Sequence, residues 1–138
     1  MRDLLTFLGE SPSRFHAVEN LRQTLEQEGY TRLSECGTWD LAVGGKYYVT
    51  RNGSALMAFR IPRKDFTGFM MSASHSDYPA FRVKENAELT GPEKYLRLNT
   101  ERYGGQLLST WLDRPLTVAG RVLVEEKGAI ATKLVYVD

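Results

Sequence analysis

An asparagine–glycine pair between two apolar segments most constrains how this chain can fold. Asn52-Gly53 separates residues 46–51 from residues 54–61, and both segments are rich in aromatic and aliphatic side chains. Asn-Gly supplies the two positive-φ positions of a type I′ turn, so the sequence predicts a β-hairpin with a two-residue loop. Such a loop places Val49 opposite Leu56. Apolar side chains then fall on both faces of the hairpin, and we expect both faces to be covered.

Two helices are expected before the hairpin. Residues 4–8 form a short apolar cluster that ends at Gly9. Ser13 is a favourable N-cap for a second helix, and Gly29 stands where a C-terminal cap is expected. The charged side chains of this second helix suit solvent. Its apolar residues recur at three- and four-residue steps and share one face: Phe15, Val18, Leu21 and Leu25.

A continuous apolar run follows the hairpin and ends in polar residues. Residues 69–73 show no alternation of apolar and polar side chains, which is typical of a strand buried on both faces of an α/β sheet. The polar residues that follow are His75-Ser76-Asp77. Ligands of open α/β sheets bind at the carboxyl ends of strands, so His75 and Asp77 are the candidate site residues.

The character of the sequence changes near residues 80–86. Beyond this point short strand-like segments alternate with Gly, Pro and Asn, and helical periodicity is weak: residues 81–84, 95–99, 116–126 and 133–137. The sequence therefore predicts an α/β fold, with helices and a sheet in its first part and a β-rich second part.

Composition excludes several classes of protein. The 18 basic and 17 acidic side chains leave a net charge of +1, which argues against a strongly basic nucleic-acid-binding protein. No apolar run approaches the ~20 residues of a membrane-spanning helix. Cys36 is the only cysteine, which excludes an internal disulfide and a multi-cysteine zinc site. Cys36 has no catalytic context, and we expect it to be buried.

His75 and Asp77 have the spacing of a metal ligand and its supporting carboxylate. A metal-binding histidine usually donates its second ring N–H to a carboxylate, which fixes the tautomer. If the strand continued to Asp77, both side chains would lie on the same face of the strand, because they are two residues apart. The other interpretation is a capped strand end without a ligand. His16, the second histidine of the chain, is interpreted as a capping or packing residue of the helix.

Seven segments in this order are similar to a known family: Ser11–Val18, Gly44–Asn52, Ala73–Asp77, Arg97–Glu101, Tyr103–Gly105, Ser109–Leu116 and Ala119–Val122. Together they resemble the N-terminal part of the M18 metallo-aminopeptidases, the aspartyl aminopeptidase family. The resemblance extends from about residue 7 to residue 138.

The resemblance implies a fold and an activity. M18 enzymes are zinc-dependent, cytoplasmic exopeptidases that remove N-terminal residues, often acidic ones, from peptide substrates. Their two-zinc site lies in an α/β catalytic domain, and an inserted β-rich domain mediates dimerisation within a dodecamer. By this resemblance residues 1–85 are the N-terminal part of the catalytic domain, and residues 86–138 begin the dimerisation domain. Nucleic-acid and membrane partners are not implied.

The resemblance also assigns the two candidate site residues. His75 corresponds to a zinc ligand, and Asp77 to the catalytic-site carboxylate that orients it. The family's bridging Asp, its adjacent pair of Glu residues and its late His match nothing in these 138 residues. We therefore expect the chain to be the N-terminal part of such an enzyme and to be inactive alone. The alternative is a non-catalytic module for self-association or regulation that derives from such an enzyme.

Overall fold

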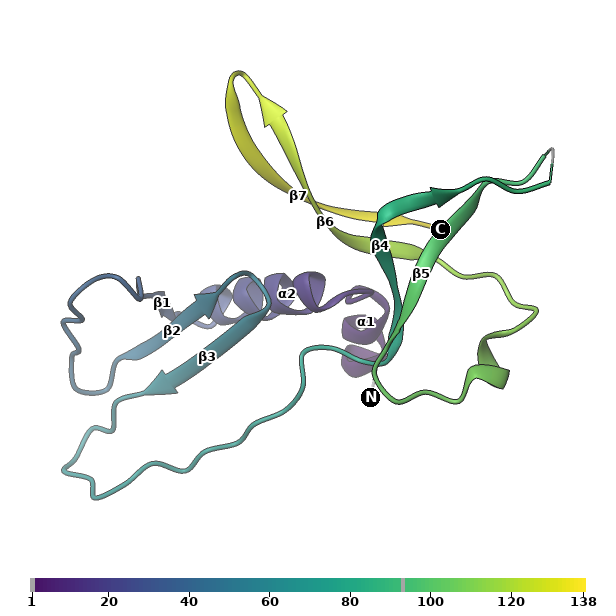
Figure 1. Cartoon of the computed structure of the whole chain (residues 1–138). Coiled ribbons are helices and arrows are strands. Elements are labelled where there is room, and N and C mark those ends of the chain that lie inside the picture. Colours follow the sequence, from purple (N-terminus) through teal and green to yellow (C-terminus); the bar gives the residue numbers. More distant parts are fainter. Residues whose placement is uncertain (1, 93) are drawn as a thin grey trace. The chain divides into compact units, whose positions relative to one another are not determined.

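The computed structural model describes residues 2–92 and 94–138, and it has the mixed α/β character that the sequence predicts (Figure 1). The chain divides into two compact units, Met1–Asp77 with Leu116–Asp138, and Tyr78–Pro115. The first unit holds two helices and five strands among the described residues: α1 (Arg2–Gly9), α2 (Arg14–Gln27), β1 (Thr31–Arg32), β2 (Lys46–Arg51), β3 (Ala55–Arg60), β6 (Val118–Glu126) and β7 (Ala129–Val137). The second unit holds β4 (Ala80–Leu89), β5 (Arg97–Tyr103) and the 3₁₀ helix η1 (Leu108–Trp111).

The predicted hairpin forms, but its register differs by one residue from the prediction. Asn52 and Gly53 both have positive φ, 55° and 63°, and the Ser54 amide donates to the Arg51 carbonyl over 3.1 Å. Arg51 then pairs with Ala55, so Ser54 belongs to the turn and does not begin the strand. The predicted pairing of Val49 with Leu56 is therefore wrong, and Val49 faces Met57. Each residue of β2 therefore pairs with the residue of β3 that lies one position later than predicted.

Helix α2 begins at the predicted cap. The Ser13 hydroxyl accepts a hydrogen bond from the His16 amide and lies 2.8 Å from His16 Nδ1. His16 thus takes part in the cap through its bonds to Ser13, one of the two roles interpreted for it, and partial burial lowers the pKa of its imidazole. Ala17 and Val18 are buried, whereas Leu21 remains 38% exposed, so the predicted apolar face is only partly covered.

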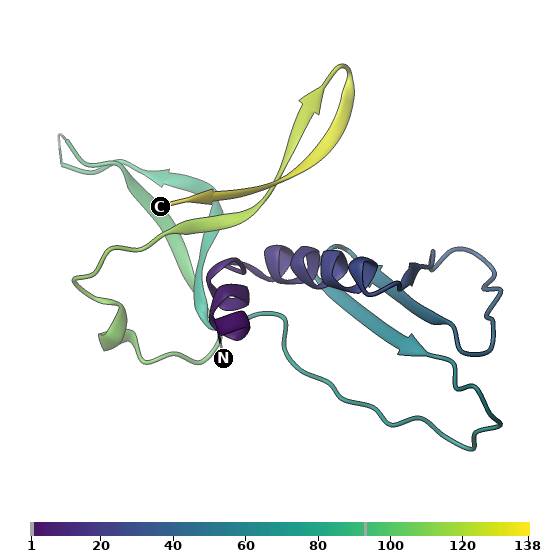
Figure 2. The same ribbon diagram turned by 180° about the vertical axis from the view of Figure 1, so that it is seen from behind.

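A hydrogen-bonded network joins α2 to the sheet. Tyr48 on β2 is fully buried, and its hydroxyl donates to Glu26 Oε1 over 2.5 Å. Arg22 lies 2.6 Å from both Glu26 and Glu19. The polar residues of α2 that were expected to face solvent therefore include the ones that bind the buried tyrosine. Figure 2 shows α2 lying along the β2–β3 hairpin.

The network shifts the acidities of its members. Hydrogen bonds from Tyr48, first, and from Arg22 lower the pKa of the Glu26 carboxyl below its ordinary value. Arg22 likewise lowers the pKa of Glu19. Burial, and next the hydrogen bond to Glu26, raises the pKa of the Tyr48 hydroxyl. These directions mean that the folded chain favours charged carboxylates and a neutral tyrosine at neutral pH.

The opposite face of the hairpin is only partly covered. Trp39 and Tyr47 pack against Phe59 with ring centroids 5.9 and 5.7 Å apart. Met57 on the same face is 54% exposed. On the α2 side Tyr48 is buried but its cross-strand partner Ala58 is exposed, so the expectation that both faces are covered is fulfilled only in part on each face.

The apolar run after the hairpin is not a strand in this structure. Residues 61–79 have no regular secondary structure, and Figure 1 shows them as an open trace between β3 and β4. Met70 is fully exposed and Met71 is 92% exposed. The predicted buried strand is therefore wrong for this chain. A strand needs neighbours that satisfy its backbone groups, and none of the described strands pairs with this segment.

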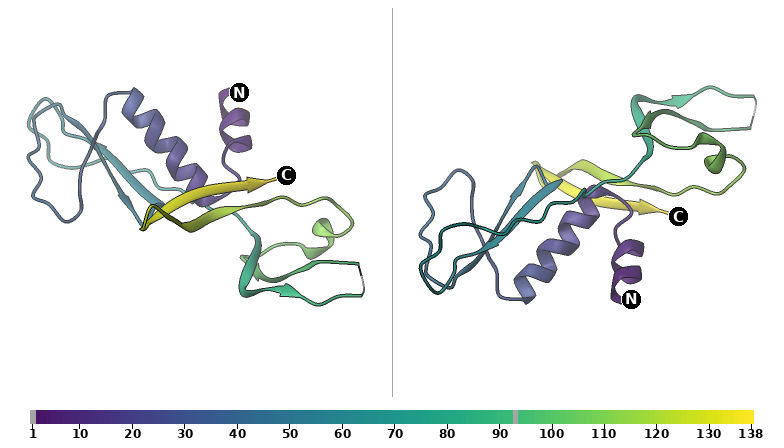
Figure 3. Two further views of the ribbon diagram at one scale, coloured as in Figure 1. Left: turned by 90° about the horizontal axis from the view of Figure 1, so that it is seen from above. Right: turned by 90° about the horizontal axis from the view of Figure 1, so that it is seen from below.

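The strand-like segments of the second half form two antiparallel ribbons, in general agreement with the sequence. β6 and β7 pair continuously from Val118↔Val137 to Glu126↔Ala129, and Figure 3 shows their long, twisted course. β4 and β5 pair with an irregularity between Val83 and Glu88. Among the described residues, no helix has the length and apolar character needed to cross a membrane. The expected domain limits at residues 85 and 86 concern the complete enzyme and stay a prediction.

Candidate metal-binding site

The structure brings the two predicted site residues together. His75 Nδ1 lies 3.1 Å from Asp77 Oδ1, which is hydrogen-bond distance. The imidazole is 91% exposed, and the Asp77 side chain is 28% exposed. When Nδ1 carries the proton and donates to Asp77, the lone pair of Nε2 is available for a metal ion.

A serine between the two residues anchors the pair to the hairpin turn. The Ser76 hydroxyl donates to the Ser54 carbonyl over 2.9 Å. This bond fixes an otherwise irregular segment beside the Asn52-Gly53 turn, although residues 61–79 form no strand. The sequence did not indicate this role for Ser76, because its acceptor is a backbone atom 22 residues away.

The described part of the chain supplies few further metal ligands. Within residues 2–92 and 94–138 no group of three or more His, Cys, Asp and Glu side chains is close enough to hold a metal ion. His16 is at the start of α2, bonded to Ser13. Cys36 is exposed, contrary to expectation, because it lies in a turn between β1 and β2 rather than in the core. The candidate site is therefore a single histidine with its carboxylate.

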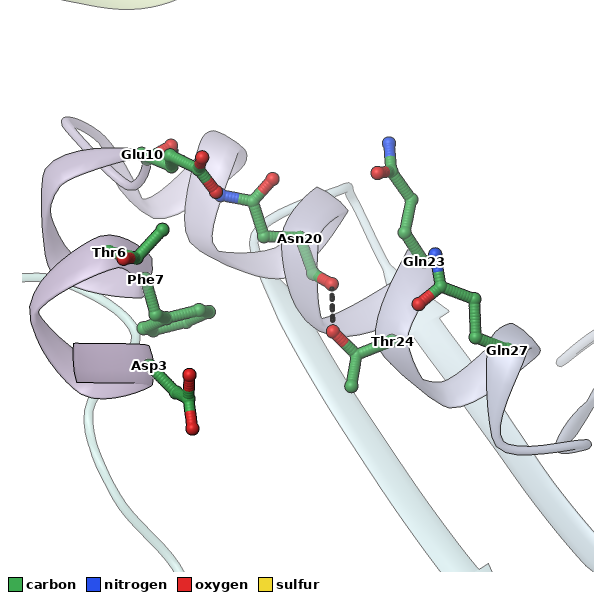
Figure 4. Close-up of a pocket in the computed structure, with 8 residues that line it drawn as sticks. All are labelled: Asp3, Thr6, Phe7, Glu10, Asn20, Gln23, Thr24 and Gln27. Atoms are coloured by element: carbon green, nitrogen blue, oxygen red, sulfur yellow. Dashed lines mark hydrogen bonds between the residues drawn. The ribbon is translucent and has the colours of Figure 1, made fainter. Parts of the chain in front are cut away.

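A cleft lies between α1 and α2, away from the two predicted site residues (Figure 4). The Asn20 amide crosses it and donates to the Glu10 carbonyl over 2.8 Å and to the Ser11 hydroxyl over 3.1 Å. These bonds hold the link between the two helices. The cleft is lined mainly by polar side chains and holds none of the predicted site residues: Asp3, Thr6, Phe7, Glu10, Asn20, Gln23, Thr24 and Gln27.

Comparison with known proteins identifies the family to which the chain is similar. The family described as aminopeptidase I zinc metalloprotease (M18) matches residues 7–138. The probable M18 family aminopeptidase 2 of Clostridium novyi is 44% identical over an alignment of 140 positions, which covers 99% of this chain and 32% of that protein. The chain thus spans about a third of the length of the curated relatives that it matches.

Solved structures agree with the sequence match. The mApe1 structure from Chaetomium thermophilum has a TM-score of 0.92 at 38% identity, over 99% of this chain and 32% of that one. The mApe1 dodecamer from S. cerevisiae has a TM-score of 0.84 at 30% identity, over 98% and 32%. By sequence and by structure, this chain belongs to the M18 family of zinc metallo-aminopeptidases.

Proposed function

We propose that this chain forms the first third of a zinc-dependent aminopeptidase, in which His75 binds zinc and Asp77 orients the imidazole. The enzyme removes single residues from the N-termini of peptides, and peptides with acidic N-terminal residues are the first substrates to test. The observation that supports this best is the contact of 3.1 Å between His75 and Asp77, within a chain that matches the M18 family over residues 7–138.

His75 and Asp77 meet part of what a zinc site requires. A neutral imidazole held by a carboxylate is a common zinc ligand, and the exposed ring of His75 leaves Nε2 accessible. A catalytic zinc takes about three protein ligands, so the others belong to the two thirds of the relatives' length that this chain does not span. When bound, a pair of zinc ions supplies Lewis-acid activation of water and of the peptide carbonyl. The role of His75 and Asp77 is to hold one ligand nitrogen in place.

The exposed apolar run supports the same proposal. Met70 and Met71 are more than nine-tenths exposed, and Phe69 is 59% exposed, immediately before the metal-site pair. A sequence typical of a doubly buried strand is stable only between neighbouring strands and covering layers. In the completed enzyme, residues 69–74 form a strand, and His75 and Asp77 lie at its carboxyl end.

The two ribbons support assembly into a homo-oligomer. Each ribbon is two-stranded and has unpaired edges within the described part of the chain. β6–β7 also exposes large apolar side chains, including Leu123 at 69% and Ile130 at 78%. A two-stranded ribbon is only marginally stable on its own, so a covering partner is expected. The yeast relative with this fold is a dodecamer, and we include a dimer-based oligomer and a cytoplasmic location in the proposal.

The same ribbons favour a second candidate function. A short protein of this family could keep them for self-association with a longer relative and have no catalytic role. The unpaired edges and the exposed Leu123 and Ile130 are the observations that favour this candidate.

Peptidase assays on two proteins separate these candidates. The first is the 138-residue chain. The second, the completed enzyme, comes from the full reading frame that contains this chain, or from a chimera in which residues 1–138 replace the matching third of the Clostridium novyi relative. We expect hydrolysis of aminoacyl substrates, sensitive to a chelator, by the completed enzyme and none by the chain alone. Chelator-sensitive hydrolysis by the purified chain, or an inactive but folded completed enzyme, would refute the proposal.

A further inference from the structure

A cavity lined by three arginines lies beside the α2 helix, within the unit formed by Met1–Asp77 and Leu116–Asp138. Its volume is about 590 Å³, and its walls come from α2, β1, β2, the β2–β3 turn and the β6–β7 ribbon. The charged side chains that line it are Glu19, Arg22, Arg32 and Arg121. Three guanidiniums and one carboxylate leave the lining with a formal net charge of +2, in a chain whose total is +1.

Carboxylates neutralise only one of these arginines. Arg22 lies 2.6 Å from both Glu19 and Glu26, so its charge is balanced. Arg32 donates to the Thr50 hydroxyl over 3.3 Å, and its positive charge also lowers the pKa of Glu19. Within residues 2–92 and 94–138, neither Arg32 nor Arg121 has a carboxylate at ion-pair distance.

Arg121 is held in place by neutral groups. Its Nη1 donates to the Asn52 carbonyl over 2.7 Å, and its guanidinium stacks 4.4 Å from the centre of the Phe15 ring. A guanidinium has five N–H donors, so one backbone hydrogen bond leaves most of its donors for another acceptor. Stacking on an aromatic ring stabilises the cation without neutralising it.

We propose that this cavity binds a phosphate group, as inorganic phosphate or as a phosphate monoester. Phosphate carries between one and a half and two negative charges at neutral pH, on the order of the excess charge of the lining. Its oxygens accept paired hydrogen bonds from guanidinium forks, and a bound phosphate would balance the positive charges of Arg32 and Arg121, which both line the cavity. Phe15 and Val18 supply apolar surface for the organic part of a monoester.

The test is a titration of the metal-free 138-residue chain with inorganic phosphate, followed by NMR at the arginine Nε–Hε signals. We expect saturable shifts of the Arg32 and Arg121 signals. Arg32→Gln and Arg121→Gln should each raise the Kd for phosphate about tenfold, since each removes charge-assisted hydrogen bonds. Arg60→Gln on β3, outside the cavity, is the matched control and should leave the Kd unchanged.

Chloride and acetate at equal ionic strength distinguish a phosphate site from general attraction to positive charge. Equal shifts with chloride or acetate, or unchanged phosphate binding in the Arg32→Gln chain, would overturn the proposal. Arg121→Gln also removes the contacts with Asn52 and Phe15. If that variant does not fold, Arg32→Gln decides the question, because among the described residues the side-chain hydrogen bond of Arg32 goes to the Thr50 hydroxyl, over 3.3 Å. The assay uses no zinc and no peptidase activity, so its result is independent of the proposed function.

Discussion

The imidazole of His75 and the carboxylate of Asp77 are held 3.1 Å apart by a chain segment that has no regular secondary structure. The anchor is the Ser76 hydroxyl, which is bonded to the Ser54 carbonyl at the hairpin turn. The pair therefore forms although no third His, Cys, Asp or Glu completes a metal-binding group among residues 2–92 and 94–138. This arrangement makes the role of Asp77 testable apart from that of His75.

Asp77→Asn should weaken zinc binding and peptidase activity of the completed enzyme by about 10- to 100-fold, the usual effect of losing an orienting carboxylate. The amide keeps the shape of the side chain but removes the charge that favours the Nδ1–H tautomer of His75. Asp40→Asn, at an exposed aspartate between β1 and β2, is the control and should leave both unchanged. Metal titration and kcat/KM measure the effect, and equal values for the two variants would contradict the role of Asp77.

Tyr48 should be the most sensitive position of the first unit. Tyr48→Ala removes a fully buried ring and should cost about 3 to 5 kcal/mol in the free energy of unfolding. Tyr48→Phe keeps the ring and should cost far less at neutral pH. Because the pKa of Tyr48 is raised in the fold, its contribution is present below the ordinary value of 10.0 and is lost as the pH rises through the folded value. Urea unfolding at neutral and alkaline pH should show that Tyr48→Phe flattens this decline.

Acid should destabilise the chain in two steps. The pKa of His16 is lowered in the fold, so its contribution is present above its ordinary value of 6.5 and lost as the pH falls through the folded value. The pKa values of Glu19 and Glu26 are also lowered, so a second loss begins below their ordinary value of 4.5. Glu26→Gln should reduce the second loss and leave the first. Urea titrations at stepped pH measure both, and an unchanged second step in the variant would show that Glu26 has no part in it.

Residues 69–74 should change state between the isolated chain and the completed enzyme. In the 138-residue chain their amides should exchange with solvent as fast as those of an unstructured peptide, because Met70 and Met71 are exposed and no described strand pairs with them. In the completed enzyme they should be protected. Hydrogen exchange with mass spectrometry compares the two, with β2 as the internal control that is protected in both. Fast exchange in the completed enzyme would contradict the proposed strand.

Local sequence signals predicted local structure well. The cap at Ser13 and the positive φ values at Asn52 and Gly53 depend on neighbouring residues alone, and both are present. The hairpin register could not be predicted, because the choice between Ser54 as strand or as turn depends on cross-strand packing. The same holds for the bond between Tyr48 and Glu26, which joins residues 22 apart in the sequence.

The same distinction applies to the candidate site. A contact between residues close in the sequence could be predicted, and a structure that depends on distant strands could not. The spacing of His75 and Asp77 predicted their contact, since two residues are enough to bring the groups together. The buried strand predicted before them is not formed, because none of the described strands pairs with this segment and a strand needs such neighbours.

We propose His75 as a zinc ligand of an M18 aminopeptidase. The most direct test is the zinc content of the purified completed enzyme, measured by mass spectrometry of the metal, with and without His75→Ala. We predict that the variant binds less zinc per protomer and loses peptidase activity, while His16→Ala keeps both. Full zinc content and full activity in the folded His75→Ala enzyme would contradict the claim.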